Sequence, residues 1–334
     1  MKLNSAWLTT NRTCNNRCEW CYAKNTLSNT QLMDFEKAKE AVDELAKRKV
    51  NRIMLIGGEP TIYPNFIELI QYIREKKIQV SLATNGRKFK DLNFAKKVIQ
   101  AGITGIDISL KAISEEEYLK NTNSYGLNEM IEGYKNLKKI GFDPSVSYVI
   151  IEDNKERFKE VVKFISSQGV DRFAIQFVKP VVEEKDDEIL DLNKMGKFVE
   201  YIYEIMNSHK EISYSMEISF PLCLINRDIL NKLVEQGRIF NCCHVPRGTG
   251  IIFDQDFKVL PCNHFAEYPF CDDSIDFSDK LSIEKLWESE TVKEFRKKAQ
   301  CYPTKKCEEC NLWIQCGGGC FTRWLYIDPN DYIK

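Results

Sequence analysis

The sequence lacks several features that mark common functional classes. No apolar run approaches the roughly 18 residues that a membrane span needs, and the opening stretch MKLNSAWLTT has no continuous apolar segment of the kind found in export signals. The 48 basic and 49 acidic residues nearly cancel, so the charge predicts neither a nucleic-acid partner nor a membrane-surface partner. We therefore expect a cytoplasmic protein.

Histidine is also scarce, with 3 residues in 334, whereas cysteine occurs 13 times. A reducing compartment disfavours structural disulfides, so clustered cysteines there point to a metal site or to catalysis. Three cysteines lie at 14–21, none lies between 22 and 222, and ten lie between 223 and 320. With so little histidine, metal chemistry must rest mainly on thiolates, and all-thiolate sites select zinc or iron–sulfur clusters.

The cysteine-free middle of the chain alternates strands with helices. Apolar runs and helical spacing predict strands near 5–10, 51–58, 79–84, 104–109, 145–151 and 172–178, and helices near 34–49, 65–77, 92–101, 127–140, 155–168 and 193–208. This alternation is typical of right-handed strand–helix–strand units and a parallel sheet. Six such units predict an α/β fold, a partial (β/α)6 barrel of parallel strands, with its active site at the carboxyl ends of the strands.

The first three cysteines directly follow the first predicted strand. Cys14, Cys18 and Cys21 have no nearby fourth ligand, because the next cysteine is 202 positions further on. A structural zinc site takes four ligands in short paired spacings. Three thiolates in one loop can instead hold three irons of a [4Fe–4S] cluster and leave the fourth iron open for a substrate or cofactor. We favour the cluster over zinc.

The stretch CNNRCEWCY (14–22) resembles the C-x3-C-x-aromatic-C motif of the radical S-adenosylmethionine (SAM) superfamily, with Trp20 as the aromatic residue. One strand later, IMLIGGEPTIYP carries Gly57, Gly58, Glu59 and Pro60 where the family binds the methionine part of SAM. Glycine lets a backbone approach a ligand closely, and Glu59 offers an acceptor for the SAM ammonium. The resemblance covers the order of elements from residue 1 to about 210.

The resemblance implies a particular chemistry. The open iron of the [4Fe–4S] cluster would bind SAM, and electron transfer would cleave the sulfonium to give a 5′-deoxyadenosyl radical that abstracts hydrogen from a substrate. An electron donor such as flavodoxin or ferredoxin is implied as a partner. Further SAM contacts are implied at the strand ends SLATNG and DISLKA and in later strands, from Thr84, Asn85, Ser109, Lys111, Ile151 and Gln176.

A second cysteine motif, CEECNLWIQCGGGC (307–320), has the spacing C-x2-C-x5-C-x3-C. A zinc ribbon pairs two C-x2-C turns about 15 to 20 residues apart, and the motif fits that pattern poorly. Its spacing matches the SPASM extension of radical SAM enzymes, which carries auxiliary iron–sulfur clusters. The stretches GIIFDQDFKVLPC (250–262) and KLSIEKLWESETVKEFRKK (280–298) resemble the hairpin and helix of that extension. We therefore expect a radical SAM partial barrel at 1–215 and a SPASM/twitch-like auxiliary-cluster domain at 216–334.

The resemblance also implies ligands for the auxiliary clusters. The first cluster would use Cys262, Cys320 and one or two of Cys223, Cys242 and Cys243, and the second would use Cys307, Cys310 and Cys316. The chain departs from the family pattern in two places, because Phe257 stands where glycine is usual and no cysteine follows Cys320. The second cluster would then take a further ligand from Cys301, Cys271 or Asp328, keep an open iron, or be absent.

Family members with this extension mostly modify peptides, and a minority act on small molecules such as aminoglycosides. We expect oxidative modification of a peptide side chain, with a carbon–carbon or thioether crosslink favoured, because auxiliary clusters can accept the electron left after hydrogen abstraction. The alternatives are formylglycine formation, epimerisation with Cys223 or Cys271 as hydrogen donor, and action on a small molecule. Two non-catalytic alternatives are a metal-binding interaction protein and a barrel that carries a zinc-bound interaction module.

The position of the first cysteines bears on how a peptide is held. Many peptide-modifying relatives carry a leader-recognition domain before the cysteine loop, but here that loop begins at residue 14. We expect the barrel mouth, the extension or a separate partner protein to hold the peptide. The charged stretch 177–194 is either a solvated loop or part of the substrate mouth.

Overall fold

The computed structural model describes residues 2–181, 190–240, 243–279 and 281–333. The chain divides into two compact units, one made of Met1–Pro144 and His244–Ala299 and the other of Ser145–Cys243 and Gln300–Lys334. Each unit is therefore assembled from two separate stretches of chain. This division follows contacts rather than function, and the domain boundary expected at residue 215 remains a prediction.

The strands of the first unit lie in the order β10-β9-β1-β2-β3-β4. β1 pairs in parallel with β2 on one side and with β9 on the other, and Ser5 lies opposite both Arg52 and Gly250. β10 is antiparallel to β9. The strand bounds are β1 (Ser5–Thr9), β2 (Arg52–Ile56), β3 (Gln79–Thr84), β4 (Gly105–Leu110), β9 (Gly250–Phe253) and β10 (Val259–Leu260).

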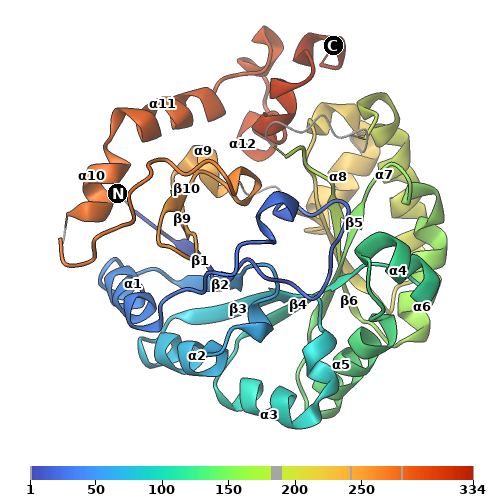
Figure 1. Ribbon diagram of the computed structural model, residues 1–334. Helices are drawn as coiled ribbons and strands as arrows, with labels where there is room; N and C mark the ends of the chain where they lie inside the picture. The colour runs from blue at the N-terminus through green and yellow to red at the C-terminus, as the bar shows by residue number, and fades with distance from the viewer. Residues whose placement is uncertain (1, 182–189, 241–242, 280, 334) are drawn as a thin grey trace. The chain divides into compact units, whose positions relative to one another are not determined.

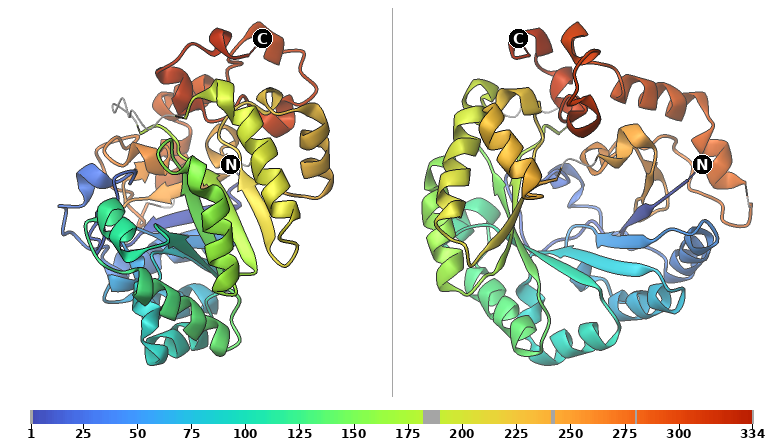
Figure 2. Two further views of the ribbon diagram at one scale, coloured as in Figure 1. Left: turned by 90° about the vertical axis from the view of Figure 1, so that its right-hand side faces the viewer. Right: turned by 180° about the vertical axis from the view of Figure 1, so that it is seen from behind.

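Helices cover the outside of these strands, as the blue to cyan helices α1, α2 and α3 show (Figures 1 and 2). They bury apolar faces against the sheet; α1, for example, buries Ala38, Ala41, Val42 and Leu45. The helix bounds in this unit are α1 (Phe35–Lys47), α2 (Phe66–Glu75), α3 (Leu92–Gln100), α4 (Glu115–Thr122), α5 (Leu127–Lys139), α9 (His244–Arg247), α10 (Ser282–Trp287) and α11 (Glu290–Ala299).

Side-chain caps define where several of these helices begin. Asp34 accepts a hydrogen bond from the backbone N–H of Lys37 at the start of α1, and Asp91 caps α3 in the same way. At α4, Ser114 accepts from the N–H of Glu117, while the Glu117 carboxylate accepts from the N–H of Ile113. This reciprocal pair is a capping box, which satisfies two backbone donors that the helix itself leaves unpaired.

The second unit repeats the strand–helix alternation. Its strands lie in the order β5-β6-β7-β8, and each neighbouring pair is parallel. The bounds are β5 (Ser145–Ile150), α6 (Phe158–Ser167), β6 (Arg172–Phe177), α7 (Leu192–Asn207), β7 (Ser213–Glu217), α8 (Arg227–Glu235), β8 (Ile239–Phe240) and α12 (Trp313–Cys316). The stretch expected to line a substrate mouth falls partly in 182–189, which lies outside the described residues.

The expected α/β fold with parallel strands is confirmed. All six expected strands and all six expected helices are present, with ends that differ by at most three residues. Among the helices and strands of the described residues, six were not expected: α4, α8, α9, α12, β7 and β8. The helix expected over 280–298 is two helices, α10 and α11, which are separated at Glu288 and Ser289.

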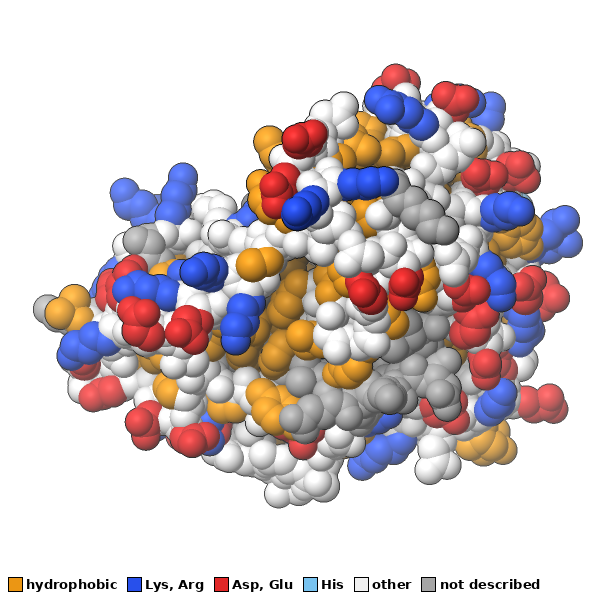
Figure 3. All heavy atoms as spheres, turned by 90° about the horizontal axis from the view of Figure 1, so that it is seen from above, with side chains coloured by type: hydrophobic (Ala, Val, Ile, Leu, Met, Phe, Trp, Pro, Cys, Tyr) orange, Lys and Arg blue, Asp and Glu red, His pale blue; other side chains and the backbone are white. Residues whose placement is uncertain are grey.

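The surface carries both charge signs. Figure 3 shows lysine, arginine, aspartate and glutamate side chains interspersed over one face of the molecule. Within the described part of the chain, none of the helices is both long enough and apolar enough to cross a membrane.

Candidate active site

The residues expected to bind SAM in the first unit follow consecutive parallel strands. The three cysteines come after β1, Gly57–Pro60 after β2, Thr84 and Asn85 at the end of β3, and Ser109 and Lys111 at the end of β4. The carboxyl ends of neighbouring parallel strands share one edge of a sheet, so the sheet brings these segments together. We call residues 10–22 the cysteine loop and residues 57–60 the GGEP loop.

The cysteine loop and the GGEP loop are bound to each other through their backbones. Gly58 N–H donates to Asn11 O at 2.8 Å, and Glu59 N–H donates to Thr13 O at 2.9 Å. A Cβ atom at Gly58 would lie 2.1 Å from Thr13 O and 2.3 Å from Arg12 O. The sequence led us to expect that glycine admits a ligand here, and the structure shows that glycine also admits the cysteine loop itself.

The buried Asn11 side chain ties the same two loops together. Its Nδ2 donates to Thr13 O at 2.7 Å and to Glu59 O at 3.3 Å, and its Oδ1 accepts from the Thr10 hydroxyl at 2.7 Å. Backbone polar groups that are buried at a loop crossing need such partners. Asn11 therefore fixes the path of the chain immediately before the first cysteine.

Glu59 is almost fully buried and its carboxylate is already engaged. Oε1 accepts from Thr61 N at 3.1 Å and from the hydroxyls of Thr61 and Thr84, both at 2.7 Å. Oε2 accepts only from Asn85 N, at 2.8 Å, among the hydrogen bonds of the described residues. Since a carboxylate offers about four acceptor positions, Oε2 is the oxygen that retains capacity for a further donor.

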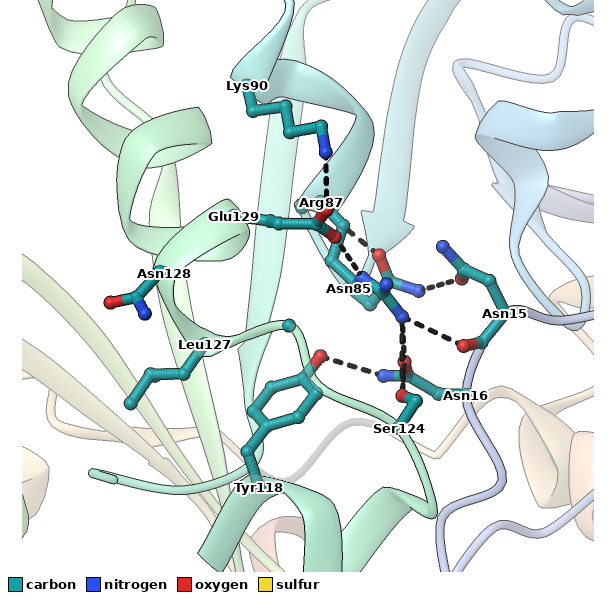
Figure 4. Close-up of polar contacts among 12 residues, drawn as sticks. Asn15, Asn16, Asn85, Arg87, Lys90, Tyr118, Ser124, Leu127, Asn128 and Glu129 are labelled. Carbon is teal, nitrogen blue, oxygen red and sulfur yellow. Dashed lines mark hydrogen bonds and ion pairs between the residues drawn. The ribbon is translucent and has the colours of Figure 1, made fainter. Parts of the chain in front are cut away.

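Arg87, three residues after the end of β3, also holds the cysteine loop (Figure 4). Arg87 Nη1 donates to Asn15 O and to Asn16 Oδ1, both at 2.8 Å. Arg87 Nε donates to Glu129 Oε2 at 2.6 Å, and Lys90 pairs with the other oxygen of Glu129. Although partial burial acts in the opposite direction, the hydrogen bonds from Lys90 and Arg87 lower the pKa of Glu129. We call this group the Arg87 clamp.

Two side-chain amides extend the clamp (Figure 4). Asn85 Nδ2 donates to Asn15 Oδ1 at 2.6 Å, so a residue expected to bind SAM also binds the cysteine loop. Asn16 Nδ2 donates to the Tyr118 hydroxyl at 2.9 Å. Charge-assisted and buried hydrogen bonds of this kind are stronger than exposed neutral ones. The segment between Cys14 and Cys18 is therefore held by β3, α4 and α5.

The carboxyl end of α4 binds the next part of the loop. Arg17 N–H donates to Thr122 O at 2.7 Å, and Glu19 N–H donates to Asn121 O at 3.2 Å. The Asn121 side chain in turn donates to Lys111 O at 2.7 Å. These carbonyls belong to the last turn of α4, where a helix leaves its acceptors unpaired. The unexpected helix α4 thus helps to position the cysteines.

The three thiols form one electrostatic group. Burial, then Glu59, then Cys18 and Cys21 raise the pKa of Cys14 to about 12, although the N–H of Asn16 acts against the rise. Burial is also the main cause that raises the pKa of Cys21, with Cys18 contributing. Three gathered thiols with no fourth ligand in the loop are a donor set that fits three irons of a [4Fe–4S] cluster.

Two of the other expected SAM residues lie beside each other at this edge. Lys111 Nζ is 5.9 Å from the centre of the Trp20 ring, within the range of a cation–π interaction. The buried Trp20 Nε1 has no hydrogen-bond partner among the described residues. An unpaired buried donor costs free energy, so Trp20 presents a donor that a ligand can satisfy.

The hairpin of β9 and β10 also contacts the cysteine loop within the first unit. Arg12, at 2% exposure, pairs with Asp254 at 2.7 Å and donates from Nε to Gln255 Oε1 at 3.2 Å. At the other end of the loop, the Tyr22 ring lies 5.5 Å from the His264 ring. Burial is the main cause that raises the pKa of Tyr22, and the thiols of Cys21 and Cys262 add to it.

The remaining cysteines are divided between the two units. Cys262 and Cys271 lie in the first unit, whereas Cys223, Cys243, Cys301, Cys307, Cys310, Cys316 and Cys320 lie in the second, as do Ile151 and Gln176. Cys242 lies outside the described residues. The first auxiliary ligand set, which includes Cys262 and Cys320, therefore remains a prediction. Among described residues, no three His, Cys, Asp or Glu side chains are grouped closely enough for a single metal ion.

Sequence reasoning missed the residues that hold the cysteine loop in place. Arg12, Asn11, Arg87, Glu129 and Asp254 form its main side-chain contacts. Local signals existed for two of them, since Asn11 lies three residues before Cys14 and Arg87 directly follows the strand-end stretch SLATNG. Glu129 and Asp254 lie far along the chain, and no periodicity or spacing marks them.

Part of the chain matches a family model, and curated proteins resemble it in sequence. Residues 8–165 match the family model described as the radical SAM superfamily. Among curated proteins, a probable GTP 3′,8-cyclase from Sulfolobus acidocaldarius is 27% identical over 220 residues, which cover 64% of this chain and 70% of that protein. One from Saccharolobus solfataricus is 27% identical over 203 residues, covering 58% of this chain and 64% of that protein. The matches thus span about two thirds of the relatives' length.

Solved structures resemble a larger part of the chain. SuiB from Streptococcus suis bound to S-adenosylmethionine matches 98% of this chain and 75% of its own, with 17% identity and a TM-score of 0.73. The structure titled native anSMEcpe with bound AdoMet matches 98% of this chain and 96% of its own, with 18% identity and a TM-score of 0.74. The chain therefore carries a radical SAM domain, and its mostly parallel α/β fold is that of the radical SAM partial barrels.

Proposed function

Starting from its radical SAM domain, we propose that this protein cleaves SAM reductively and oxidatively modifies a peptide side chain, with a carbon–carbon or thioether crosslink as the favoured product. The observation that carries the first part is the cysteine loop, whose three thiols are gathered beside the GGEP loop by contacts from β2, β3, α4 and α5.

In this proposal the cysteine loop holds a [4Fe–4S] cluster through Cys14, Cys18 and Cys21. When bound, the cluster supplies the electron that cleaves SAM to a 5′-deoxyadenosyl radical. The protein contributes orientation and exclusion of water. The Arg87 clamp and the contacts to α4 keep the three thiols in a fixed arrangement, so little reorganisation is needed when the cofactors bind.

The neighbouring strand ends would hold SAM itself. Glu59 Oε2 has capacity for the SAM ammonium, since it accepts one hydrogen bond from Asn85. Trp20 offers its Nε1 donor, and Lys111 supplies a positive charge at the same edge. Gly57, Gly58, Pro60, Thr84 and Ser109 complete the proposed SAM set. Thr84 and Asn85 act partly through Glu59, because each donates a hydrogen bond to its carboxylate.

Support for a peptide substrate comes from the proteins whose fold this chain shares. The structures with 98% coverage of this chain include SuiB bound to precursor peptide SuiA and anSMEcpe bound to the Cp18Cys peptide. The likeness extends through the cysteine-rich part of the chain, where auxiliary clusters would accept the electron that remains after hydrogen abstraction and ring closure. An electron donor such as flavodoxin or ferredoxin completes the proposed system.

A nucleotide substrate is the second candidate, and the names of the curated relatives favour it. Proteins called probable GTP 3′,8-cyclase match 58–64% of this chain at 26–27% identity. The peptide proposal rests on fold likeness over nearly the whole chain, whereas the nucleotide alternative rests on sequence likeness over less of it. We place the peptide first because ten of the 13 cysteines lie between 223 and 320, where peptide-modifying relatives carry auxiliary clusters.

The first test separates radical SAM chemistry from a purely metal-binding role. The protein is reconstituted anaerobically, and iron, sulfide and 5′-deoxyadenosine formation are measured for the wild type and for a Cys14/Cys18/Cys21→Ala variant. We expect the variant to lose about four irons, because one cube holds four, to keep the others and to form no 5′-deoxyadenosine. Equal SAM cleavage by both proteins would overturn the proposal.

The second test separates the two substrate classes. SAM cleavage by the reconstituted enzyme is measured with GTP alone and with a pool of synthetic peptides that together contain all side chains, and products are analysed by mass spectrometry. A peptide that loses two hydrogens while 5′-deoxyadenosine forms supports oxidative modification. Stimulation by GTP alone supports the nucleotide alternative, and unchanged peptide mass with inverted stereochemistry identifies an epimerase.

A further inference from the structure

The loop after β7 is packed onto the C-terminal cysteine motif within the second unit. Ser219 O accepts from the N–H of Cys320 at 2.9 Å. Gly319 has φ +81°, and a Cβ there would lie 2.8 Å from the backbone of Phe220. Two residues after Phe220, Leu222 donates its N–H to the Cys316 thiol at 3.3 Å. Three contacts in a row therefore lay residues 219–222 along residues 316–320.

Cys223 follows this contact by one residue. Leu222, whose N–H donates to the Cys316 thiol, directly precedes Cys223, so the Cys223 backbone begins beside Cys316. Backbone hydrogen bonds join the other cysteines of the motif to the same turns, because Cys310 N–H donates to Cys307 O at 3.3 Å and Trp313 N–H donates to Cys310 O at 3.0 Å. The fold therefore brings Cys223 to the motif that contains Cys307, Cys310 and Cys316, although Cys223 lies 84 positions before Cys307 in the sequence.

We propose that Cys223 supplies the fourth thiolate to Cys307, Cys310 and Cys316, so that these four residues hold one iron–sulfur cluster. The proposal rests on the auxiliary clusters of the proposed function and gives one of them a ligand that the motif spacing does not reveal. It changes the expectation from the sequence, in which Cys223 served the first auxiliary cluster or donated hydrogen to a substrate radical.

A cluster and a single metal ion place different demands on four thiolates. Four thiolates around one zinc ion lie at about 2.3 Å from a shared centre, whereas a [4Fe–4S] cluster takes one thiolate at each of its four irons. In the part of the chain that the structure describes, no group of three or more His, Cys, Asp or Glu side chains is placed to hold a single metal ion. Backbone N–H groups that point at cluster sulfurs also tune their redox potential, and Leu222 N–H points at Cys316.

The other ligands considered for this cluster are placed differently. Cys271 lies in the first unit, where its thiol donates to Asp273 O at 3.3 Å. Asp328 Oδ1 accepts from the backbone N–H and the side-chain amide of Asn330, at 2.8 and 2.9 Å, and so caps its own helical turn. Cys301 lies in the same unit as the four thiols and remains the alternative that the experiment must exclude.

The experiment uses the full chain with the SAM cluster removed. In the Cys14/Cys18/Cys21→Ala background, four further variants are compared with the parent: Cys223→Ser, Cys307→Ser, Cys301→Ser and Cys271→Ser. Each protein is reconstituted anaerobically with iron and sulfide. Iron and sulfide per chain are then measured together with Mössbauer and EPR spectra. Thermal unfolding of the iron-free proteins, followed by circular dichroism, verifies that each variant folds.

We expect Cys223→Ser and Cys307→Ser to lose the same cluster. Each should show either loss of about four irons or conversion to a [3Fe–4S] form with its own EPR signal, while Cys301→Ser and Cys271→Ser match the parent. Cys223→Asp, which restores an anionic ligand, should recover iron with an altered spectrum. Because Cys223 is exposed, its substitution should leave the unfolding temperature of the iron-free chain unchanged.

Two results would overturn the proposal in different ways. If Cys307→Ser loses iron but Cys223→Ser matches the parent, an auxiliary cluster exists and Cys223 does not bind it. Loss of iron in Cys301→Ser would then identify Cys301 as the fourth ligand. If neither Cys307→Ser nor Cys223→Ser changes the iron content, the auxiliary cluster itself is absent, and that part of the proposed function fails while SAM cleavage stands on its own test.

Discussion

Arg12 and Asp254 form an ion pair of 2.7 Å in which both side chains are at least nine-tenths buried. Arg12 lies two residues before the first cysteine, and Asp254 directly follows β9. Their pairing joins the cysteine loop to the hairpin within the first unit. The two groups respond differently to loss of the partner. Burial raises the pKa of Asp254 by more than the charge of Arg12 lowers it, so Asp254 can become neutral, whereas an arginine stays charged in proteins.

This difference predicts an asymmetric pair of variants. Asp254→Asn leaves a buried cation that cannot shed its charge, so we expect a loss of about 3–5 kcal/mol in the free energy of unfolding. Arg12→Met should cost less, because Asp254 can take up a proton. Urea unfolding of the iron-free protein measures both. The double variant Arg12→Met/Asp254→Asn should be less destabilised than the sum of the singles, and simple additivity would contradict a direct interaction.

The close approach of the two loops at Gly58 predicts that this position admits no side chain. Gly58→Ala places a Cβ 2.1 Å from Thr13 O, so the cysteine loop must move. We expect a destabilisation of about 1–3 kcal/mol, as for overpacked sites, and loss of SAM cleavage. Gly105→Ala is the control, because its Cβ would lie 3.4 Å from the Ser81 side chain. Normal SAM cleavage by Gly58→Ala would show that the loops can separate.

The Arg87 clamp predicts a pH dependence of stability. Hydrogen bonds from Lys90 and Arg87 lower the folded-state pKa of Glu129, against its partial burial. The resulting stabilisation is present above the unfolded pKa of about 4.3 and is lost as the pH falls through the lowered folded pKa. Glu129→Gln should therefore be less stable than the wild type near neutral pH and approach it in acid.

The matched control for the clamp is Glu132→Gln, an exposed position on the same helix. The stabilities of both variants and of the wild type are compared by their unfolding midpoints in urea. The midpoints are measured between pH 3 and pH 7, at steps of about one pH unit. A constant difference between Glu129→Gln and the wild type across that range would show that the Glu129 charge does not support the clamp.

The turn between β9 and β10 predicts an inverted order of two substitutions. Phe257 has φ +63°, a left-handed conformation that costs a side chain about 1–2 kcal/mol, and its buried ring packs edge-on against Phe277. Phe257→Gly loses the ring but gains the relaxed backbone. Phe257→Ala loses the ring, about 3–5 kcal/mol, and keeps the strain.

We therefore expect Phe257→Gly to be more stable than Phe257→Ala by about 1 kcal/mol, and both to be less stable than the wild type. Thermal unfolding of the iron-free variants measures the order. If Phe257→Ala were the more stable variant, the turn would have to adopt another backbone conformation once the phenyl ring is removed. Phe257 thus combines a strained backbone conformation with a buried aromatic ring that offsets the strain.

The sequence predicted the elements well because their signals are local. The apolar run of β2 and the spacing of apolar residues in α2 lie within single segments, and both ended within two residues of expectation. The cysteine and GGEP motifs were equally visible. Contacts such as Arg12 with Asp254, 242 positions apart, depend on how the sheet is assembled and leave no periodic trace. Thr84 and Asn85 show the same limit, since their bonds to Glu59 were not foreseeable from their strand.

The pairing of β1 with β9 also bears on when the cysteine loop can reach its final contacts. Gly250 pairs opposite Ser5 although it lies 245 positions later. A ribosome adds about 5–20 residues each second, so about 10–50 s pass between synthesis of the two strands. Throughout that interval the nascent cysteine loop lacks the partner that Arg12 meets at Asp254. The loop can therefore complete its contacts only after about three quarters of the chain has been synthesised.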